Sequence, residues 1–552
     1  MAFAFSFRPR LIDALKGYDR TRLIADVGAG LTVAVVALPL AMAFAIASGL
    51  KPEAGIFTTI VAGFLVALLG GSRVQIGGPA GAFIVIVYGI VQRYGVANLI
   101  IATALSGVLL FAMGLLRLGT LVRFIPVAVI TGFTNGIAVL IALSQVKDFL
   151  GLRVAHMPAD FFGILGALGA HLGSLNPWAL GLALGALAVI VLWQHWMPSL
   201  GAHAPFSGKL NMVPGAIVAL VLSTAAVALF QLPVETIGSR FGGIPAQLPA
   251  FALPAFSWES ARFVLVPAIT LALLGAIESL LCARVADGIT GDRHDPNQEL
   301  MAQGVANFVV PFLGGMPATG TIARTVTNIK SGATSPVAGM VHALVLLVVI
   351  LVAAPLASSI PLACLAAILI HVAWNMGEWR AFVHLRRYRA TYRTTLLSVF
   401  LLTVVFDLTV AVQVGILAAC ATFIYRMAGL TRAEPIALPA PSGAPQRVQA
   451  WRLSGALFFG SATALEDVHA ALQGAQQGDA LVLDLGGVIY MDSTGAETLG
   501  TLLHDCRKRG LRVLVAALAG QPLDLARRTG LHASLGADVY PGLDAALAAA
   551  QG

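Results

Sequence analysis

Long apolar stretches dominate the chain and recur up to about residue 427. The first runs from Ala25 to Leu50, and others follow at 97–116, 262–283 and 337–357. A helix needs roughly 20 apolar residues to cross the hydrocarbon core of a bilayer. With a mean hydropathy of +0.87 and 11% charged residues, the chain lacks the polar surface that a water-soluble protein of this length needs. We therefore expect a polytopic α-helical membrane protein, with the lipid bilayer as its surroundings.

Basic residues cluster at two places beside these stretches. Five precede the first stretch, and five arginines lie between two late stretches, at 380–393. Positive charge in short flanks and loops marks the cytoplasmic face. We therefore expect both termini in the cytoplasm of a bacterial-type inner membrane, with residues 1–24 as a cytoplasmic N-terminal segment. Nucleic acid is not an expected partner, because the basic clusters lack interleaved aromatic residues.

Two glycine–proline breaks interrupt the apolar pattern. Gly77-Gly78-Pro79 precedes a short apolar piece at 80–92, and Gly314-Gly315-Met316-Pro317 precedes a polar piece at 319–331. Counting the polar piece gives 14 membrane segments, an even number that agrees with termini on one side.

The spacing of the breaks indicates an internal repeat. Pro79 lies 40 residues after Pro39 of the first helix, and Pro317 lies 39 residues after Glu278 of a later helix. Paired interrupted segments in the two halves are the best sequence pointer to a transporter's central binding site. The alternative is two unrelated loops that contain turn residues.

Short helices that begin inside the membrane favour an anion. Their first backbone N–H groups are unpaired, and the helix dipoles place positive potential there. The residues at both starts are small (Ala80 and Gly81, Ala318 and Gly320), so a ligand can approach the backbone closely. Hydroxyl groups of Thr319, Thr321 and Thr325 are further candidate donors.

Arg324 is an intramembrane cation in the polar piece. A guanidinium at this depth costs several kcal/mol against lipid, so it must face protein or water. We interpret it as the group that draws an anion into the site, with a structural ion pair or snorkelling to an interface as the alternative.

Glu278 is the matching intramembrane carboxylate, in an otherwise apolar helix. It is the candidate coupling residue, because an intramembrane carboxylate can take a proton on one side and release it on the other. The alternative is a fixed partner for Arg324, which is compatible with coupling if an anion displaces the carboxylate. A passive channel or uniporter has no need of such a group.

The composition changes after Leu430. Residues 431–448 hold four prolines and read as a linker, and 449–552 alternate strand and helix patterns typical of a small α/β domain. Residues 25–430 then form the transport domain. Ser493 and Thr494 lie between a strand and a helix, where helix capping competes with a regulatory role. No nucleophile–base pair or Walker motif is readable, so we expect neither an enzyme nor an ATP-driven pump, and no metal or other cofactor.

Together these segments resemble the sulfate permease (SulP, solute carrier 26) family over nearly the whole chain. The resemblance rests on Ala276-Ile-Glu-Ser-Leu-Leu, Asn297-Gln-Glu-Leu and Pro317-Ala-Thr-Gly-Thr-Ile-Ala-Arg-Thr. The tail, with Asp492-Ser-Thr-Gly, resembles a STAS (sulfate transporter and anti-sigma antagonist) domain.

The resemblance implies two inverted seven-helix repeats, core and gate domains, elevator-like alternating access and a homodimer. It also implies a substrate held between half-helices 3 and 10 beside an aromatic residue of helix 1. The corresponding positions here are Phe44, Ala80, Gly81, Thr321, Ile322, Ala323 and Arg324.

Departures from the family pattern bear on the substrate and the coupling ion. Leu40 replaces a glutamine found in many members, and Cys282 stands where sodium symporters carry a hydroxyl, which favours protons over sodium. The segment Gly275-Ala-Ile-Glu-Ser-Leu-Leu-Cys is similar to bacterial C4-dicarboxylate members. We therefore expect uptake of a C4-dicarboxylate such as fumarate, or of sulfate, with protons, and bicarbonate as the third choice. The alternatives are a passive anion channel or uniporter and a sodium-coupled bicarbonate transporter. The STAS domain implies a cytosolic partner, and a membrane sensor is a further alternative.

Overall fold

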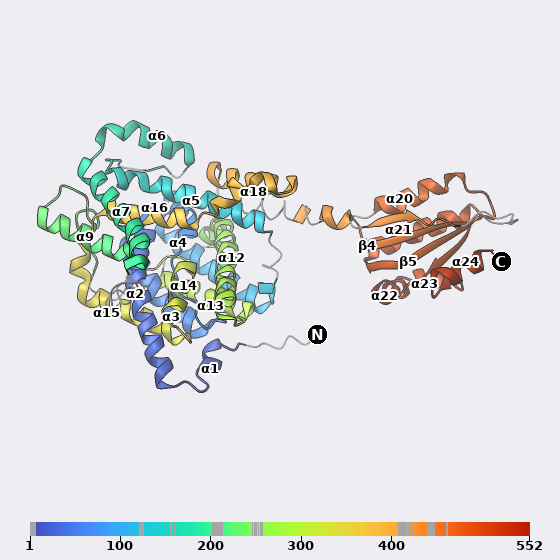
Figure 1. The fold of residues 1–552 in the computed structure, drawn as a ribbon, viewed down its shortest axis with the longest axis horizontal. Coiled ribbons are helices and arrows are strands. Elements are labelled where there is room, and N and C mark those ends of the chain that lie inside the picture. The colour runs from blue at the N-terminus through green and yellow to red at the C-terminus, as the bar shows by residue number, and fades with distance from the viewer. Residues whose placement is uncertain are drawn as a thin grey trace. The chain divides into compact units, whose positions relative to one another are not determined.

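The chain divides into two compact units, Met1–Ile416 and Leu417–Gly552, in a computed structural model (Figure 1). The structure describes residues 7–551 except for 121–125, 155, 156, 159, 201–213, 246, 248–250, 252, 254–257, 407–413, 415, 416, 418, 419, 422, 423, 430, 439–447, 460 and 461.

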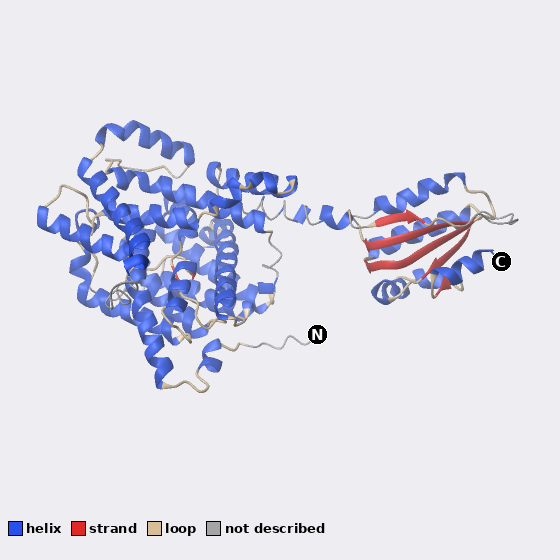
Figure 2. Cartoon of the chain, in the orientation of Figure 1, coloured by secondary structure: helices blue, strands red, loops and turns tan. Residues whose placement is uncertain are grey.

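The first unit is helical (Figure 2). Its α-helices are α1 Arg10–Ala14, α2 Arg20–Ala47, α3 Pro52–Leu69, α4 Ile84–Leu115, α5 Val127–Leu150, α6 Phe161–His171, α7 Pro177–Leu200, α9 Gly215–Phe230, α10 Ile237–Phe241, α11 Trp258–Phe263, α12 Leu265–Thr290, α13 Pro296–Val309, α14 Ile322–Lys330, α15 Val337–Ala357, α16 Leu362–Met376, α17 Trp379–Val383 and α18 Ala390–Val405.

These helices match a multi-pass membrane protein. Among the described residues, 6 helices are long and apolar enough to cross a membrane, and shorter apolar helices of 10–17 residues accompany them. The stretch expected at 411–427 falls largely outside the described residues.

The order of elements repeats once within this unit. A long helix, a shorter helix, a two-residue strand and a new helix start occur as α2, α3, β1 (Gly77–Gly78) and the 3₁₀ turn η1 (Gly81–Phe83). They recur as α12, α13, β2 (Thr319–Gly320) and α14. The two strands pair antiparallel, with Gly77 opposite Gly320 and Gly78 opposite Thr319. The opposite chain directions agree with the expected inverted repeats.

The two repeats interlock through their helices. Helix α13 of the second repeat packs against α4 of the first, and α15 packs against α2 and α3. Helix α4 breaks at Gly95, whose φ of 77° and ψ of 169° are not helical. This break separates the stretches that the sequence predicts at 80–92 and 97–116, so the first short helix runs from η1 to the residues before Gly95.

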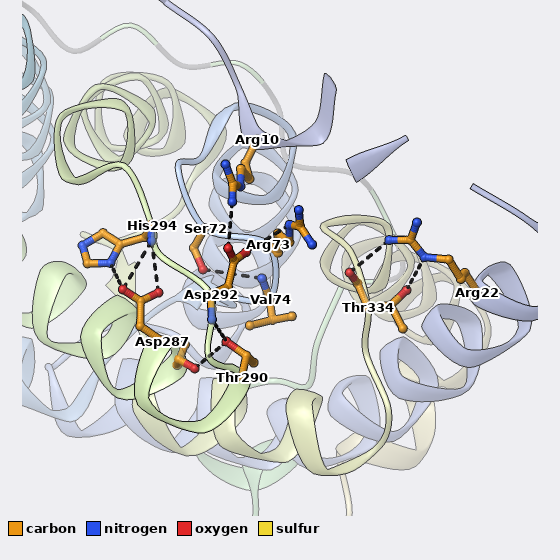
Figure 3. Close-up of polar contacts among 11 residues, drawn as sticks. Arg10, Arg22, Ser72, Arg73, Val74, Asp287, Thr290, Asp292, His294 and Thr334 are labelled. Atoms are coloured by element: carbon orange, nitrogen blue, oxygen red, sulfur yellow. Dashed lines mark hydrogen bonds and ion pairs between the residues drawn. The ribbon is translucent and has the colours of Figure 1, made fainter. Parts of the chain in front are cut away.

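The N-terminal segment is fastened to the ends of these repeats (Figure 3). Asp292 forms ion pairs with Arg10 Nη2 at 2.8 Å and with Arg73 Nε at 3.0 Å. Arg22 donates to the hydroxyl and carbonyl oxygens of Thr334, just after α14. These contacts join the start of the chain to the segment before β1 and to the end of α12.

Buried Asp26 of α2 strengthens the same junction. It accepts hydrogen bonds from the backbone N–H groups of Thr334 and Ser335 and from the Tyr18 hydroxyl at 2.8 Å. Burial and the hydrogen bond to Asp26 raise the pKa of Tyr18 to about 12. Tyr18 therefore remains a protonated donor at physiological pH, and the charge of Asp26 has several donors.

The second unit is an α/β domain. Its sheet has the order β3-β4-β5-β6-β7, in which β3 is antiparallel to β4 and the other neighbours are parallel. Its elements are β3 Arg432–Pro435, β4 Val448–Leu457, α20 Ala462–Ala471, β5 Ala480–Met491, α21 Ser493–Lys508, β6 Arg512–Ala516, α22 Gly520–Arg528, α23 Leu531–Leu535, β7 Val539–Tyr540 and α24 Leu543–Gln551.

Successive residues of a strand point to opposite faces of the sheet. Both faces of this sheet carry apolar residues, and helices cover both. Leu481 and Leu483 of β5 join an apolar cluster with α20, α21, α22 and α23, whereas Val482 joins a second cluster with α24. Strand β3 lies within the range expected as a linker, 431–448, so part of that range belongs to the sheet.

Candidate functional site

The start of α14 is fixed to the segment before β1 by hydrogen bonds. Thr321 is the residue that precedes the helix, and both its N–H and its hydroxyl donate to the Ile76 carbonyl, at 2.9 and 3.0 Å. The Ile76 N–H donates to Thr325 Oγ1 at 3.0 Å, and the Thr319 hydroxyl donates to the Gly275 carbonyl. The three hydroxyls that the sequence suggested as anion donors therefore already bond protein groups.

The start of the other short helix offers space instead of polar side chains. Ala80 precedes η1 in extended backbone and is buried. A methyl group added to Gly81 would lie 3.3 Å from Ile141 Cδ1 and 3.6 Å from Phe44 Cε1. The glycine thus lets α2 and α5 approach the helix start, and it brings Phe44 beside Gly81 as the sequence predicts.

Neither helix start is capped by its own side chain. The residues that precede η1 and α14, Ala80 and Thr321, make no side-chain capping hydrogen bond. Uncapped first-turn N–H groups are the donors that an anion uses at a helix N-terminus. Ile322 is half-buried and Ala323 is exposed, so the start of α14 is open on one side.

Arg324 is enclosed at the crossing of β1 and β2. Its side chain is 1% exposed, Nη1 donates to Thr59 Oγ1 at 3.5 Å, and the buried Nη2 has no hydrogen-bond partner in the described structure. A side chain at Gly78 would collide with the guanidinium, so this glycine makes room for it. Arg324 therefore holds a positive charge next to the start of η1 with one donor group still available.

Glu278 lies on α12, which packs against β2 and α14 at the same crossing. The Gly275 carbonyl accepts from Thr319, and the Cys282 thiol donates to Thr325 Oγ1 at 3.2 Å. Residues three and four apart share one face of a helix, so Glu278 lies on the face that meets β2 and α14. It is half-buried, and it has no hydrogen bond or ion pair within the described residues. The structure therefore contains no fixed Arg324–Glu278 pair.

A second buried carboxylate lies beside α12 and was not singled out from the sequence. Glu299 of α13 is 0% exposed and accepts from the Gly71 N–H at 2.9 Å, the Gln303 amide at 3.2 Å and the Ser279 hydroxyl at 3.3 Å. The Gln75 amide donates to the same Ser279 hydroxyl. The run Asn297-Gln-Glu contained the signal, because a polar start on a helix that must be buried requires partners.

Ser493 and Thr494 lie in the second unit, in the first turn of α21. Both are exposed, and Asp492 rather than either hydroxyl caps the helix, accepting from the Gly495 N–H at 2.7 Å. Among the described residues, no group of three or more His, Cys, Asp or Glu side chains is placed to hold a metal ion.

The helical membrane unit contains two inverted repeats, and the short helices of the two repeats begin next to each other. This arrangement defines the class of the protein, a membrane transporter. Comparison with known proteins assigns the family. Residues 23–398 match the sulfate permease family and residues 444–546 match the STAS domain. The chain belongs to the sulfate permease family, whose members transport anions.

Individual relatives cover nearly the whole chain. It is 41% identical to YvdB of Bacillus subtilis (strain 168) over 532 residues, 96% of this chain and 97% of that protein. It is 34% identical to the bicarbonate transporter BicA of Picosynechococcus sp. over 523 residues, 90% of this chain and 89% of BicA. The structure of the murine Slc26a9 anion transporter superposes with a TM-score of 0.87, at 19% identity, over 98% of this chain and 94% of that one, which confirms the fold.

Proposed function

We propose that the protein takes up a small anion together with a proton by elevator-like alternating access. The observation that carries the proposal is Glu278, a carboxylate that faces the crossing of the two short helices without a fixed partner. Burying an unpaired charge is costly, so a carboxylate in this position favours the state in which it binds a proton.

Charge balance supports coupling. Arg324 brings one positive charge to the crossing, and Glu278 and the incoming anion both bring negative charge. In a poorly solvated site like charges repel strongly, so an anion enters more readily when Glu278 is protonated. A proton that enters with the anion and leaves after release of the anion would link the two fluxes.

The substrate in this proposal is a C4-dicarboxylate such as fumarate, or sulfate. Gly81 lies between Phe44 and Ile141 at the start of η1, which favours a small ligand. The uncapped helix starts favour an anionic ligand. Bicarbonate is the alternative substrate, because BicA is named as a bicarbonate transporter. The thiol of Cys282 argues against sodium as the coupling ion, since sodium prefers hard oxygen ligands.

The proposal also covers the position of the chain in the membrane, its domain boundaries, its assembly and its regulation. Both termini lie on the cytoplasmic side of a bacterial inner membrane, and the protein assembles as a homodimer. Residues 25–430 form the transport domain and 449–552 the STAS domain, and the connecting range 431–448 includes strand β3 of the STAS sheet. Exposed Ser493 and Thr494 are candidate positions for modification, and the STAS domain is the candidate surface for a cytosolic partner.

The test is uptake of radiolabelled fumarate, sulfate and bicarbonate into proteoliposomes, with and without an inward proton gradient and with a sodium gradient as comparison. We expect proton-driven accumulation of one anion by the wild type, and equilibration without accumulation by Glu278→Gln. Equilibration that is independent of the gradient in both proteins would favour a uniporter or channel.

A further inference from the structure

A pocket of about 220 Å³, lined by both apolar and charged side chains, lies at the end of the transport unit opposite the N-terminal segment. Helix α2 starts beside that segment at Arg20 and runs for 28 residues, which is about 42 Å at 1.5 Å per residue. The pocket begins where α2 ends, at Ile46 and Gly49, and extends to Tyr88 of α4 and Lys147 of α5. It therefore opens on the membrane face to which α2 leads.

The pocket is lined by the same helices that contact the proposed anion site. Phe44 and Ile141 contact the position of Gly81, whereas residues one turn or less further along each helix, Ile46, Ile84 and Ser144, line the pocket. The same three helices thus form both places.

The positive charge of the pocket comes from Lys147. Arg240 also lines the pocket, but its Nη1 lies 2.7 Å from Asp148 Oδ1 and 3.6 Å from Glu235 Oε2, so nearby carboxylates neutralise it. Lys147 Nζ donates to the Val154 carbonyl at 2.6 Å, and no carboxylate in the described part of the chain lies within ion-pair distance of it. The half-buried ammonium is left with a neutral partner.

Neutral polar side chains complete the pocket. Gln92, Ser144 and Gln145 line it, and the Gln145 amide donates to the Ser144 hydroxyl at 2.9 Å. The Tyr88 hydroxyl donates to the Met157 carbonyl, so Lys147 and Tyr88 both bond carbonyls of the segment that follows α5. A charged acceptor makes a stronger hydrogen bond with an ammonium than a neutral carbonyl does, so an anion can replace Val154 as the partner of Lys147.

We propose that this pocket is a capture subsite for the transported anion, with Lys147 as its binding cation. The proposal rests on the proposed function, since it assumes that an anion is the cargo. It adds a binding place on one membrane face only, before the anion reaches the crossing of the short helices.

The test compares transport from the two faces. Initial rates of radiolabelled sulfate and fumarate transport are measured in right-side-out and everted membrane vesicles for wild type, Lys147→Gln and Lys147→Arg. Arg153→Gln is the matched control, because Arg153 is exposed in the segment that follows α5 but does not line the pocket. Size-exclusion profiles check that each variant is folded.

For Lys147→Gln we expect KM to rise about 10-fold when the anion is presented to the pocket face, because the variant loses one hydrogen bond between charged groups. The KM from the other face and the maximal rate should stay at wild-type values, and Lys147→Arg should retain most of the affinity. An unchanged KM at the pocket face, or an equal rise at both faces, would overturn the subsite. If the wild type carries neither anion, bicarbonate is assayed in the same vesicles, and failure with all three anions overturns the proposed function and the subsite with it.

Discussion

Helices α12 and α13 each carry a carboxylate inside the transport unit, and the two carboxylates have opposite surroundings. Glu299 of α13 is closed off from solvent and accepts hydrogen bonds from a backbone N–H, an amide and a hydroxyl. Glu278 of α12 is half-buried, faces the crossing of the short helices and has no partner among the described residues. A carboxylate with satisfied hydrogen bonds is part of the structure, whereas one without partners is free to exchange a proton.

The largest expected effect comes from removing the partnered carboxylate. Glu299→Ala leaves the Gly71 N–H, the Ser279 hydroxyl and the Gln303 amide without their acceptor, and each buried unsatisfied group costs about 1–3 kcal/mol. We expect little folded protein and a strongly lowered Tm in detergent, measured by fluorescence-detected size exclusion. Glu278→Ala is the matched variant and should keep a near wild-type Tm. Equal destabilisation by the two substitutions would break the comparison.

The next effect concerns space at the start of the first short helix. A side chain at Gly81 meets Ile141 at 3.3 Å and Phe44 at 3.6 Å, whereas nothing lies within 4 Å of a side chain at Gly89 on the same helix. Overpacking costs about 1–3 kcal/mol. Because Gly81 lies at the proposed anion site, we expect this cost to fall on the anion-bound state, so Gly81→Val should lower the initial uptake rate about 10- to 100-fold. Gly89→Val should transport within about twofold of the wild type, because it adds no contact. Equal rates for the two variants would show that the anion does not pass Gly81.

The smallest expected effect concerns two nearby polar positions in the STAS domain, one with a hydrogen-bonding role in the fold and one without. Asp492 caps α21, and Thr494, two residues later, has an exposed side chain that takes no part in the cap. Asp492→Ala should destabilise the STAS domain by about 1 kcal/mol. Thr494→Ala should change its stability by less than about 0.5 kcal/mol. Thermal unfolding of the full chain, followed by a probe in the second unit, measures both, and a larger loss for Thr494→Ala would contradict the assignment of the cap.

Features that depend on local sequence could be predicted. The glycine–proline breaks located the starts of η1 and α14, the contact of Phe44 with Gly81 followed from the family resemblance, and Glu278 was conspicuous as a charge in an apolar helix. The alternation of strand and helix patterns indicated a small α/β domain at 449–552, although strand β3 was not predicted, because it lies in a proline-rich stretch.

Features that depend on contacts distant in sequence could not be predicted. The hydrogen bond between Gly71 and Glu299 joins positions 228 residues apart, and no local pattern indicates it. The hydrogen bonds that the Thr319 and Thr321 hydroxyls donate to backbone carbonyls were not predicted for the same reason. The Lys147 pocket requires three helices from different parts of the chain, and Lys147 alone reads as an ordinary charge at the end of a span.

The most direct test of the central claim is proton movement itself. The transported anion is added to proteoliposomes that contain a pH-sensitive dye, without an imposed proton gradient. Wild type and Glu278→Gln are compared at matched protein content. The account predicts a proton flux into the vesicles that accompanies anion entry in the wild type and is absent in Glu278→Gln. Anion entry by the wild type without any proton flux, or an unchanged flux in the variant, would contradict the role of Glu278.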